Sequence, residues 1–179
     1  MTRTRDLLFY RTFVTAVIVY AIVSCSRGTP VVESYPESMA HRINIDGTII
    51  HYFDFHPEAS GLPVIYVHGY SGVGFEAFYW YEALGEQHRL IAPDLPGSGY
   101  SDKPDVEYTA DFYADFLLRF VDGLGIDRFH LVAHSVGGQV AIKFATSEHT
   151  GTRVDRLVLL APYALDRQAS PLLELLADV

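Results

Sequence analysis

The chain has 179 residues, of which 49% are hydrophobic and 13% aromatic, so it can bury a core and is neither disordered nor of low complexity. This length indicates one domain. Asp and Glu outnumber Lys and Arg by 22 to 13, which argues against a nucleic-acid partner, because such surfaces need clustered basic side chains. The single cysteine, Cys25, excludes an intrachain disulfide and a multi-cysteine metal site.

The first 24 residues have the layout of a secretory signal peptide. A segment with three arginines precedes 12 uncharged and mostly apolar residues, Thr12–Val23, which are too few for a transmembrane helix. The sequence Ile22-Val23-Ser24-Cys25 resembles the lipobox of bacterial lipoproteins, and the resemblance implies cleavage before Cys25 and lipidation of its thiol. An ordinary cleaved signal and an uncleaved anchor are the alternatives.

A lipoprotein-type signal peptide over residues 1–24 predicts export across the inner membrane and a location in the bacterial cell envelope. The lipid on Cys25 would then be the membrane anchor, because the remaining chain is strongly acidic and would not bind anionic lipid by charge. Residues 25–38 contain Pro, Gly and Ser without periodicity and are predicted to form a tether.

From residue 39 onward, predicted strands alternate with predicted helices. Two β-prone runs, 41–45 and 49–55, flank Asp46-Gly47-Thr48, and Asp-Gly is a strong hairpin signal. Further strands are predicted at 63–67, 90–92, 129–133 and 157–161, and helices at 75–87, 111–124 and 136–146. This alternation, with unbroken apolar runs such as residues 157–161, indicates an α/β fold with a mostly parallel sheet and flanking helices.

Residues 129–138 (FHLVAHSVGG) contain the motif that points to chemistry. A strand leads into Ser135 and at once into a helix, which resembles the nucleophile elbow of the α/β-hydrolase fold superfamily. The sharp turn needs small residues two positions before and after the serine. These are Ala133 and Gly137 here, whereas the family usually has glycine at both places. A chance match, or a serine that caps the helix, is the alternative.

Two more segments support the resemblance. His68-Gly69-Tyr70-Ser71-Gly72 follows the strand at 63–67, and the resemblance implies that the backbone N–H of Tyr70 and that of Val136 are the two oxyanion donors. We expect the His68 side chain to be structural, because the donors are backbone groups. Residues 94–101 (DLPGSGYS) match the D-x-P-G-x-G-x-S loop of the superfamily, in which we expect Asp94 to be structural.

A serine nucleophile limits the chemistry. An alkyl group on Ser135 would be a stable ether, so epoxide or haloalkane cleavage is disfavoured. Acyl transfer to water is the reaction that serine supports, with a small carboxylic ester or related acyl compound as the substrate. No metal and no cofactor are expected, since the sequence has no metal-ligand cluster, Rossmann fingerprint or phosphate-binding loop.

The general base is missing from the predicted site. In the superfamily the acid and the histidine follow the nucleophile, but only His149 follows Ser135, at the far end of the next helix. The side chain of His134 should project away from Ser135. Asp166 lies several residues too far along the chain to be the acid.

We therefore expect residues 39–166 to form a partial α/β-hydrolase core, the N-terminal part of that fold, and residues 167–179 to begin a truncated cap region. The chain as given is expected to be incomplete and inactive. The competing hypothesis is a non-catalytic, lipid-anchored binding or structural lipoprotein that keeps half of a hydrolase fold.

Overall fold

The computed structural model of the chain describes residues 37–163. The predicted signal peptide, Cys25, most of the predicted tether, Asp166 and the predicted start of the cap lie outside the described residues. Among residues 37–163, no helix has the length and apolar character needed to cross a membrane.

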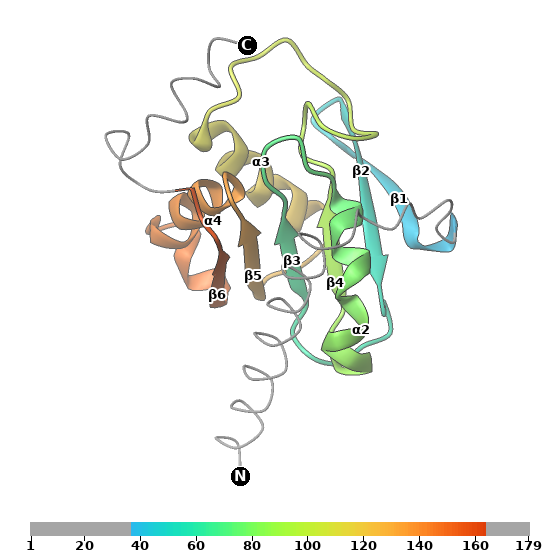
Figure 1. Cartoon of the computed structure of the whole chain (residues 1–179). Coiled ribbons are helices and arrows are strands. Elements are labelled where there is room, and N and C mark those ends of the chain that lie inside the picture. The colour runs from blue at the N-terminus through green and yellow to red at the C-terminus, as the bar shows by residue number, and fades with distance from the viewer. Residues whose placement is uncertain (1–36, 164–179) are drawn as a thin grey trace.

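Six strands form one sheet in the order β1-β2-β4-β3-β5-β6 (Figure 1). They are β1 (Ala40–Ile45), β2 (Thr48–Phe55), β3 (Val64–Val67), β4 (Leu90–Pro93), β5 (Phe129–His134) and β6 (Val154–Leu160). β1 pairs with β2 and β2 with β4 in antiparallel fashion, whereas the pairs β3–β4, β3–β5 and β5–β6 are parallel. The hairpin is confirmed, and its turn residues Asp46 and Gly47 have φ values of +50° and +89°.

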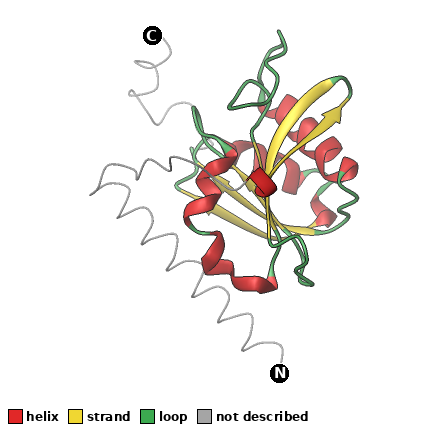
Figure 2. Cartoon of the chain, turned by 90° about the vertical axis from the view of Figure 1, so that its right-hand side faces the viewer, coloured by secondary structure: helices red, strands yellow, loops and turns green. Residues whose placement is uncertain are grey.

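Helices cover both faces of this sheet (Figure 2). On one face lie α3 (Ala110–Gly123) and α4 (Gly137–Thr146). On the other lie η2 (Gly74–Tyr79), α2 (Tyr81–Leu84) and η3 (Gly85–Gln87), of which η2 and η3 are 3₁₀-helices. Two further 3₁₀-helices are η1 (Glu37–Met39) and η4 (Gly151–Arg153).

A hydrophobic core lies on each face of the sheet, because successive side chains of the inner strands point to opposite faces. On β3, Ile65 and Val67 pack toward α3 and α4, and Val64 and Tyr66 pack toward η2 and α2. Every residue of β3 and β4 is buried. The predicted α/β class, with a mostly parallel sheet whose inner strands are covered on both faces, is confirmed.

The single helix predicted over residues 75–87 is wrong. The segment instead divides into η2, α2 and η3, and the Trp80 N–H donates to Ala77 O at 3.2 Å. A 3₁₀-helix has three residues per turn, so it directs Ala77 and Trp80 to the same buried side.

Strand β6 begins three residues before the predicted strand at 157–161, because Val154 and the charged Asp155 and Arg156 also belong to it. Among the described residues β6 pairs only with β5 and lies at the edge of the sheet. Its side chains are half-buried or exposed, and Leu157 is 38% exposed. The apolar sequence of residues 157–160 is typical of an interior strand, whereas β6 is an edge strand among the described residues.

The order of the central strands determines where a site can form. After β3 the chain adds β4 on one side, and it then returns to add β5 on the other side of β3. The connections that follow β3 and β5 therefore lead to opposite sides, and such a switch point is where ligands bind in open α/β sheets. The His68–Gly72 loop follows β3, and Ser135 follows β5.

Candidate active site

Ser135 occupies the turn between β5 and α4, as the sequence predicts. Its φ is +50°, a left-handed conformation that costs free energy for a residue with a side chain. Three backbone hydrogen bonds hold this conformation. The Ser135 N–H donates to Leu160 O at 3.0 Å, and Ser135 O accepts from the N–H groups of Gly138 and Tyr163 at 2.9 and 2.8 Å.

Close backbone packing explains the small residues around the turn. A Cβ on Gly137 would lie 2.5 Å from His68 O and 2.6 Å from Val67 O, so only glycine fits there. A Cβ on Gly69 would lie 3.0 Å from the Ser135 Cβ. The loop after β3 thus packs directly against the serine, as the resemblance implied.

Two backbone N–H groups near the Ser135 turn have no acceptor among the described residues. Within residues 37–163, neither the Tyr70 N–H nor the Val136 N–H donates a hydrogen bond. Val136 is the N-cap of α4, so its N–H is one of those that a helix leaves unpaired. The Tyr70 side chain is 87% exposed. The Tyr70 N–H follows Gly69, which packs against Ser135, and the Val136 N–H follows Ser135 directly in the chain.

The His68 side chain is buried and connects two loops. Its Nδ1 lies 2.8 Å from Gly69 O, and the Leu95 N–H donates to Nε2 at 3.0 Å, so the ring is a neutral Nδ1–H tautomer. Burial lowers the pKa of His68 below its ordinary value, and the nearby carboxylates only partly oppose this effect. Both ring nitrogens bind backbone groups, which is the structural role expected for His68.

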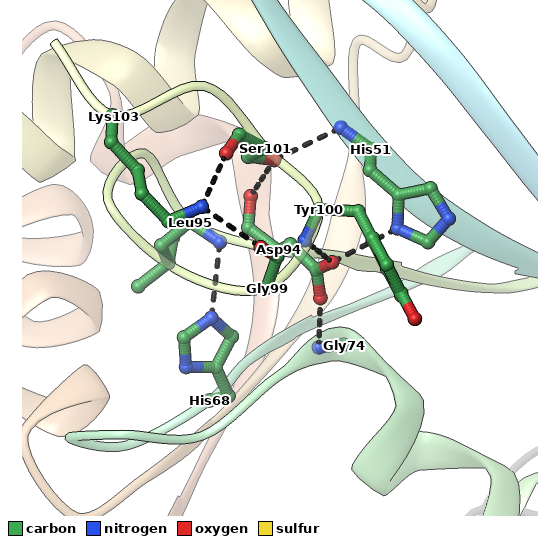
Figure 3. Close-up of polar contacts among 9 residues, drawn as sticks. All are labelled: His51, His68, Gly74, Asp94, Leu95, Gly99, Tyr100, Ser101 and Lys103. Atoms are coloured by element: carbon green, nitrogen blue, oxygen red, sulfur yellow. Dashed lines mark hydrogen bonds and ion pairs between the residues drawn. The ribbon is translucent and has the colours of Figure 1, made fainter.

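Asp94 begins the loop that follows β4, and its carboxylate binds three other residues (Figure 3). Its Oδ2 lies 2.9 Å from His51 Nδ1 and accepts from the Tyr100 N–H at 2.9 Å, while Oδ1 accepts from the Gly74 N–H at 2.7 Å. Burial raises the pKa of this carboxyl, but hydrogen bonds from His51, Tyr100 and Gly74 outweigh burial and leave the pKa below its ordinary value. Asp94 therefore joins β2, η2 and the loop after β4, the structural role that the sequence predicted.

No histidine is placed to activate Ser135. All eight histidines of the sequence lie within residues 37–163, and none of them makes a hydrogen bond with the Ser135 hydroxyl there. His149 lies beyond the ten-residue helix α4, which is about 15 Å long. The His134 ring faces Glu76, with Nδ1 3.9 Å from Oε2.

Two residues beside the site were not predicted. Glu76 of η2 lies next to the loop after β3, and Tyr66 of β3 donates from its hydroxyl to Glu76 Oε2 at 2.7 Å. Glu76 fell within a predicted helix and Tyr66 within a predicted buried strand, so neither had a motif. Among residues 37–163, no group of three or more His, Cys, Asp or Glu side chains is arranged to hold a metal ion.

Comparison with known proteins extends these observations. Residues 63–178 match the alpha/beta hydrolase fold family. The chain is 36% identical over 112 residues to a 2-hydroxymuconate semialdehyde hydrolase of Pseudomonas sp. (strain CF600), covering 60% of this chain and 38% of that protein. It is 34% identical over 120 residues to a soluble epoxide hydrolase of Corynebacterium sp. (strain C12), covering 67% of this chain and 40% of the relative.

A solved structure shares the fold. The meta-cleavage product hydrolase of Pseudomonas fluorescens IP01 superimposes with a TM-score of 0.59 and 32% identity, over 71% of this chain and 46% of that one. The chain thus spans less than half the length of the relatives described here. The matched family covers more than half of the chain, and the strand order and the strand–turn–helix at Ser135 agree with it. The protein belongs to the alpha/beta hydrolase fold family.

Proposed function

We propose that this chain carries the nucleophile and the oxyanion hole of a serine hydrolase, with Ser135 as the nucleophile and the N–H groups of Tyr70 and Val136 as the oxyanion donors. The observation that carries the proposal is the left-handed conformation of Ser135, at φ +50°, beside two backbone N–H groups that have no acceptor among residues 37–163. A strained serine at the N-terminus of a helix is the arrangement that acyl transfer needs.

The names of the relatives indicate different reactions, and the residue type at position 135 favours one class of reaction over the others. One relative is named a semialdehyde hydrolase and another an epoxide hydrolase. A serine that opened an epoxide would be left as an ether that water does not cleave, whereas an acyl-serine is hydrolysed. The substrate class that fits is therefore a small carboxylic ester or related acyl compound.

The general base that this reaction needs is not among the histidines of the chain, so the chain alone should acylate Ser135 very slowly. A base in solution can replace a missing one. Adding imidazole to the full chain with p-nitrophenyl acetate should therefore produce ester cleavage faster than imidazole gives without protein, and the acetyl group should be found on Ser135 by mass spectrometry.

The control is Ser135→Ala, which removes the nucleophile and keeps the loops. An imidazole-dependent rate equal in both proteins, with no acetyl group on Ser135, would contradict the proposal. That result would instead favour the second candidate, a non-catalytic binding or structural lipoprotein.

We also propose that residues 1–24 are a lipoprotein-type signal peptide and that Cys25 is lipidated, which would anchor the protein in the cell envelope. The support is the basic segment, the short apolar segment and Ile-Val-Ser-Cys in sequence. Residues 1–40 fused to a reporter in a bacterium should incorporate labelled palmitate. Label that persists after Cys25→Ala would refute lipidation at this cysteine.

A further inference from the structure

The carboxylate of Glu76 lies against the loop that carries the proposed oxyanion donor. A Cβ on Gly72 would be 2.5 Å from Glu76 Oε1, so the carboxylate occupies the space that a side chain at Gly72 would take. Gly72 closes the turn, since its N–H donates to Gly69 O at 3.1 Å. Tyr70 lies inside this turn, and the direction of its N–H depends on the shape of the turn.

Glu76 is itself fixed by a buried hydroxyl. Tyr66 is 3% exposed, and its hydroxyl donates to Glu76 Oε2 at 2.7 Å. The backbone N–H of Glu76 also donates to Val73 O at 3.1 Å. The carboxylate therefore has a defined place between the β3 side chain and the turn, in contrast to a freely rotating surface glutamate.

The same turn is held from its other sides. Gly69 O also faces His68 Nδ1 at 2.8 Å, and a Cβ on Gly69 would lie 3.3 Å from His134 Nδ1. His134 Nδ1 lies 3.9 Å from Glu76 Oε2. Glu76 thus contacts the turn on one side of Gly69 and faces the residue that precedes Ser135 on the other.

We propose that Glu76, held by Tyr66, is a positioning residue that maintains the Gly69–Gly72 turn and so directs the Tyr70 N–H toward the oxyanion at Ser135. This inference rests on the proposed serine hydrolase function. Its action depends on the hydrogen bond and the volume of the side chain, because a negative charge beside a developing oxyanion is electrostatically unfavourable.

The first measurement does not depend on activity. Amide hydrogen exchange at Gly72, followed by NMR in the full chain, should be about tenfold faster in Glu76→Ala and in Tyr66→Phe, since each loses a contact that closes the turn. Glu76→Gln should exchange at the wild-type rate, because its amide oxygen still accepts from Tyr66. Glu82→Ala removes a second tyrosine-bonded glutamate, which Tyr81 contacts at 3.5 Å on α2, and should leave Gly72 unchanged.

The second measurement is the imidazole-supported acylation of Ser135. Glu76→Ala should lower the acylation rate constant roughly tenfold to a hundredfold with little change in KM, because the oxyanion donor acts in the transition state. Glu76→Gln should keep the wild-type rate or exceed it. Equal loss in the Gln and Ala variants would overturn a role through hydrogen bonding and volume.

The two proposals fail in different ways. If wild type shows no Ser135-dependent acylation, the proposed function fails, and Gly72 exchange still decides the role of Glu76. If Gly72 exchange is the same in wild type and Glu76→Ala, the positioning role is refuted, whatever the rate. A lower free energy of unfolding in Glu76→Ala without faster Gly72 exchange or slower acylation would assign Glu76 a merely structural role and also refute the proposal.

Discussion

Protonation of His130 should make the fold sensitive to acid. His130 lies on β5, is 7% exposed, and has Nδ1 3.4 Å from Asp155 Oδ2. Burial lowers its pKa from 6.5 to about 4, although the carboxylate of Asp155 acts in the opposite direction. His88, Arg128 and Arg156 add to the effect of burial.

The sign of the effect follows from the two states of the protein. In the unfolded chain His130 binds a proton near pH 6.5, whereas in the folded chain it stays neutral down to about pH 4. The free energy of unfolding is therefore unaffected by His130 above pH 6.5, and it declines as the pH falls from 6.5 toward 4. At 1.36 kcal/mol per pKa unit, the whole difference is about 3 kcal/mol, and roughly 2.5 kcal/mol of it is lost by pH 4.5.

Urea unfolding at several pH values, followed by the fluorescence of the single tryptophan, Trp80, measures this decline. Other groups titrate in the same range, so the comparison is with His130→Gln, which cannot take up the proton. Wild type should lose roughly 2.5 kcal/mol more than the variant between pH 7.5 and 4.5. Parallel curves for the two proteins would refute the reasoning, because they would mean that His130 titrates alike in the folded and unfolded chains.

Three substitutions test the packing of the loops around the site and of the core. Asp94→Asn should lower the free energy of unfolding by about 3 kcal/mol at pH 7, because an amide cannot accept from all three donors; a loss below 1 kcal/mol in urea unfolding would contradict this. Gly137→Ala should cost about 2 kcal/mol by overpacking against His68 O and should abolish imidazole-supported acylation, and a wild-type rate would show that the turn can relax. Phe120→Ala, which removes a fully buried side chain of α3, should cost about 4 kcal/mol by thermal unfolding, whereas an unchanged Tm would mean that the core collapses around the cavity.

Local signals were sufficient for most elements of the fold. Asp46-Gly47 specified the hairpin through its positive φ values, and the apolar stripe of residues 111–124 corresponds closely to α3, which begins after the Thr109 cap. The strand–turn–helix at Ser135 was predicted from ten consecutive residues. These features depend on turn chemistry and side-chain period, which neighbouring residues carry.

Contacts between distant parts of the chain were decided only by tertiary structure. Residues 74–79 form a 3₁₀-helix because Ala77 and Trp80 are buried against β3 and β4. The shape of that sheet surface depends on distant residues, so the local sequence period does not predict it. His68 reaches the Leu95 N–H, 27 residues away, and Tyr66 holds Glu76 across two elements. Such partners meet because the sheet brings β3 beside both β4 and β5. The strand–turn–helix at Ser135 can therefore be predicted from the sequence, whereas the groups that pack around it depend on long-range contacts.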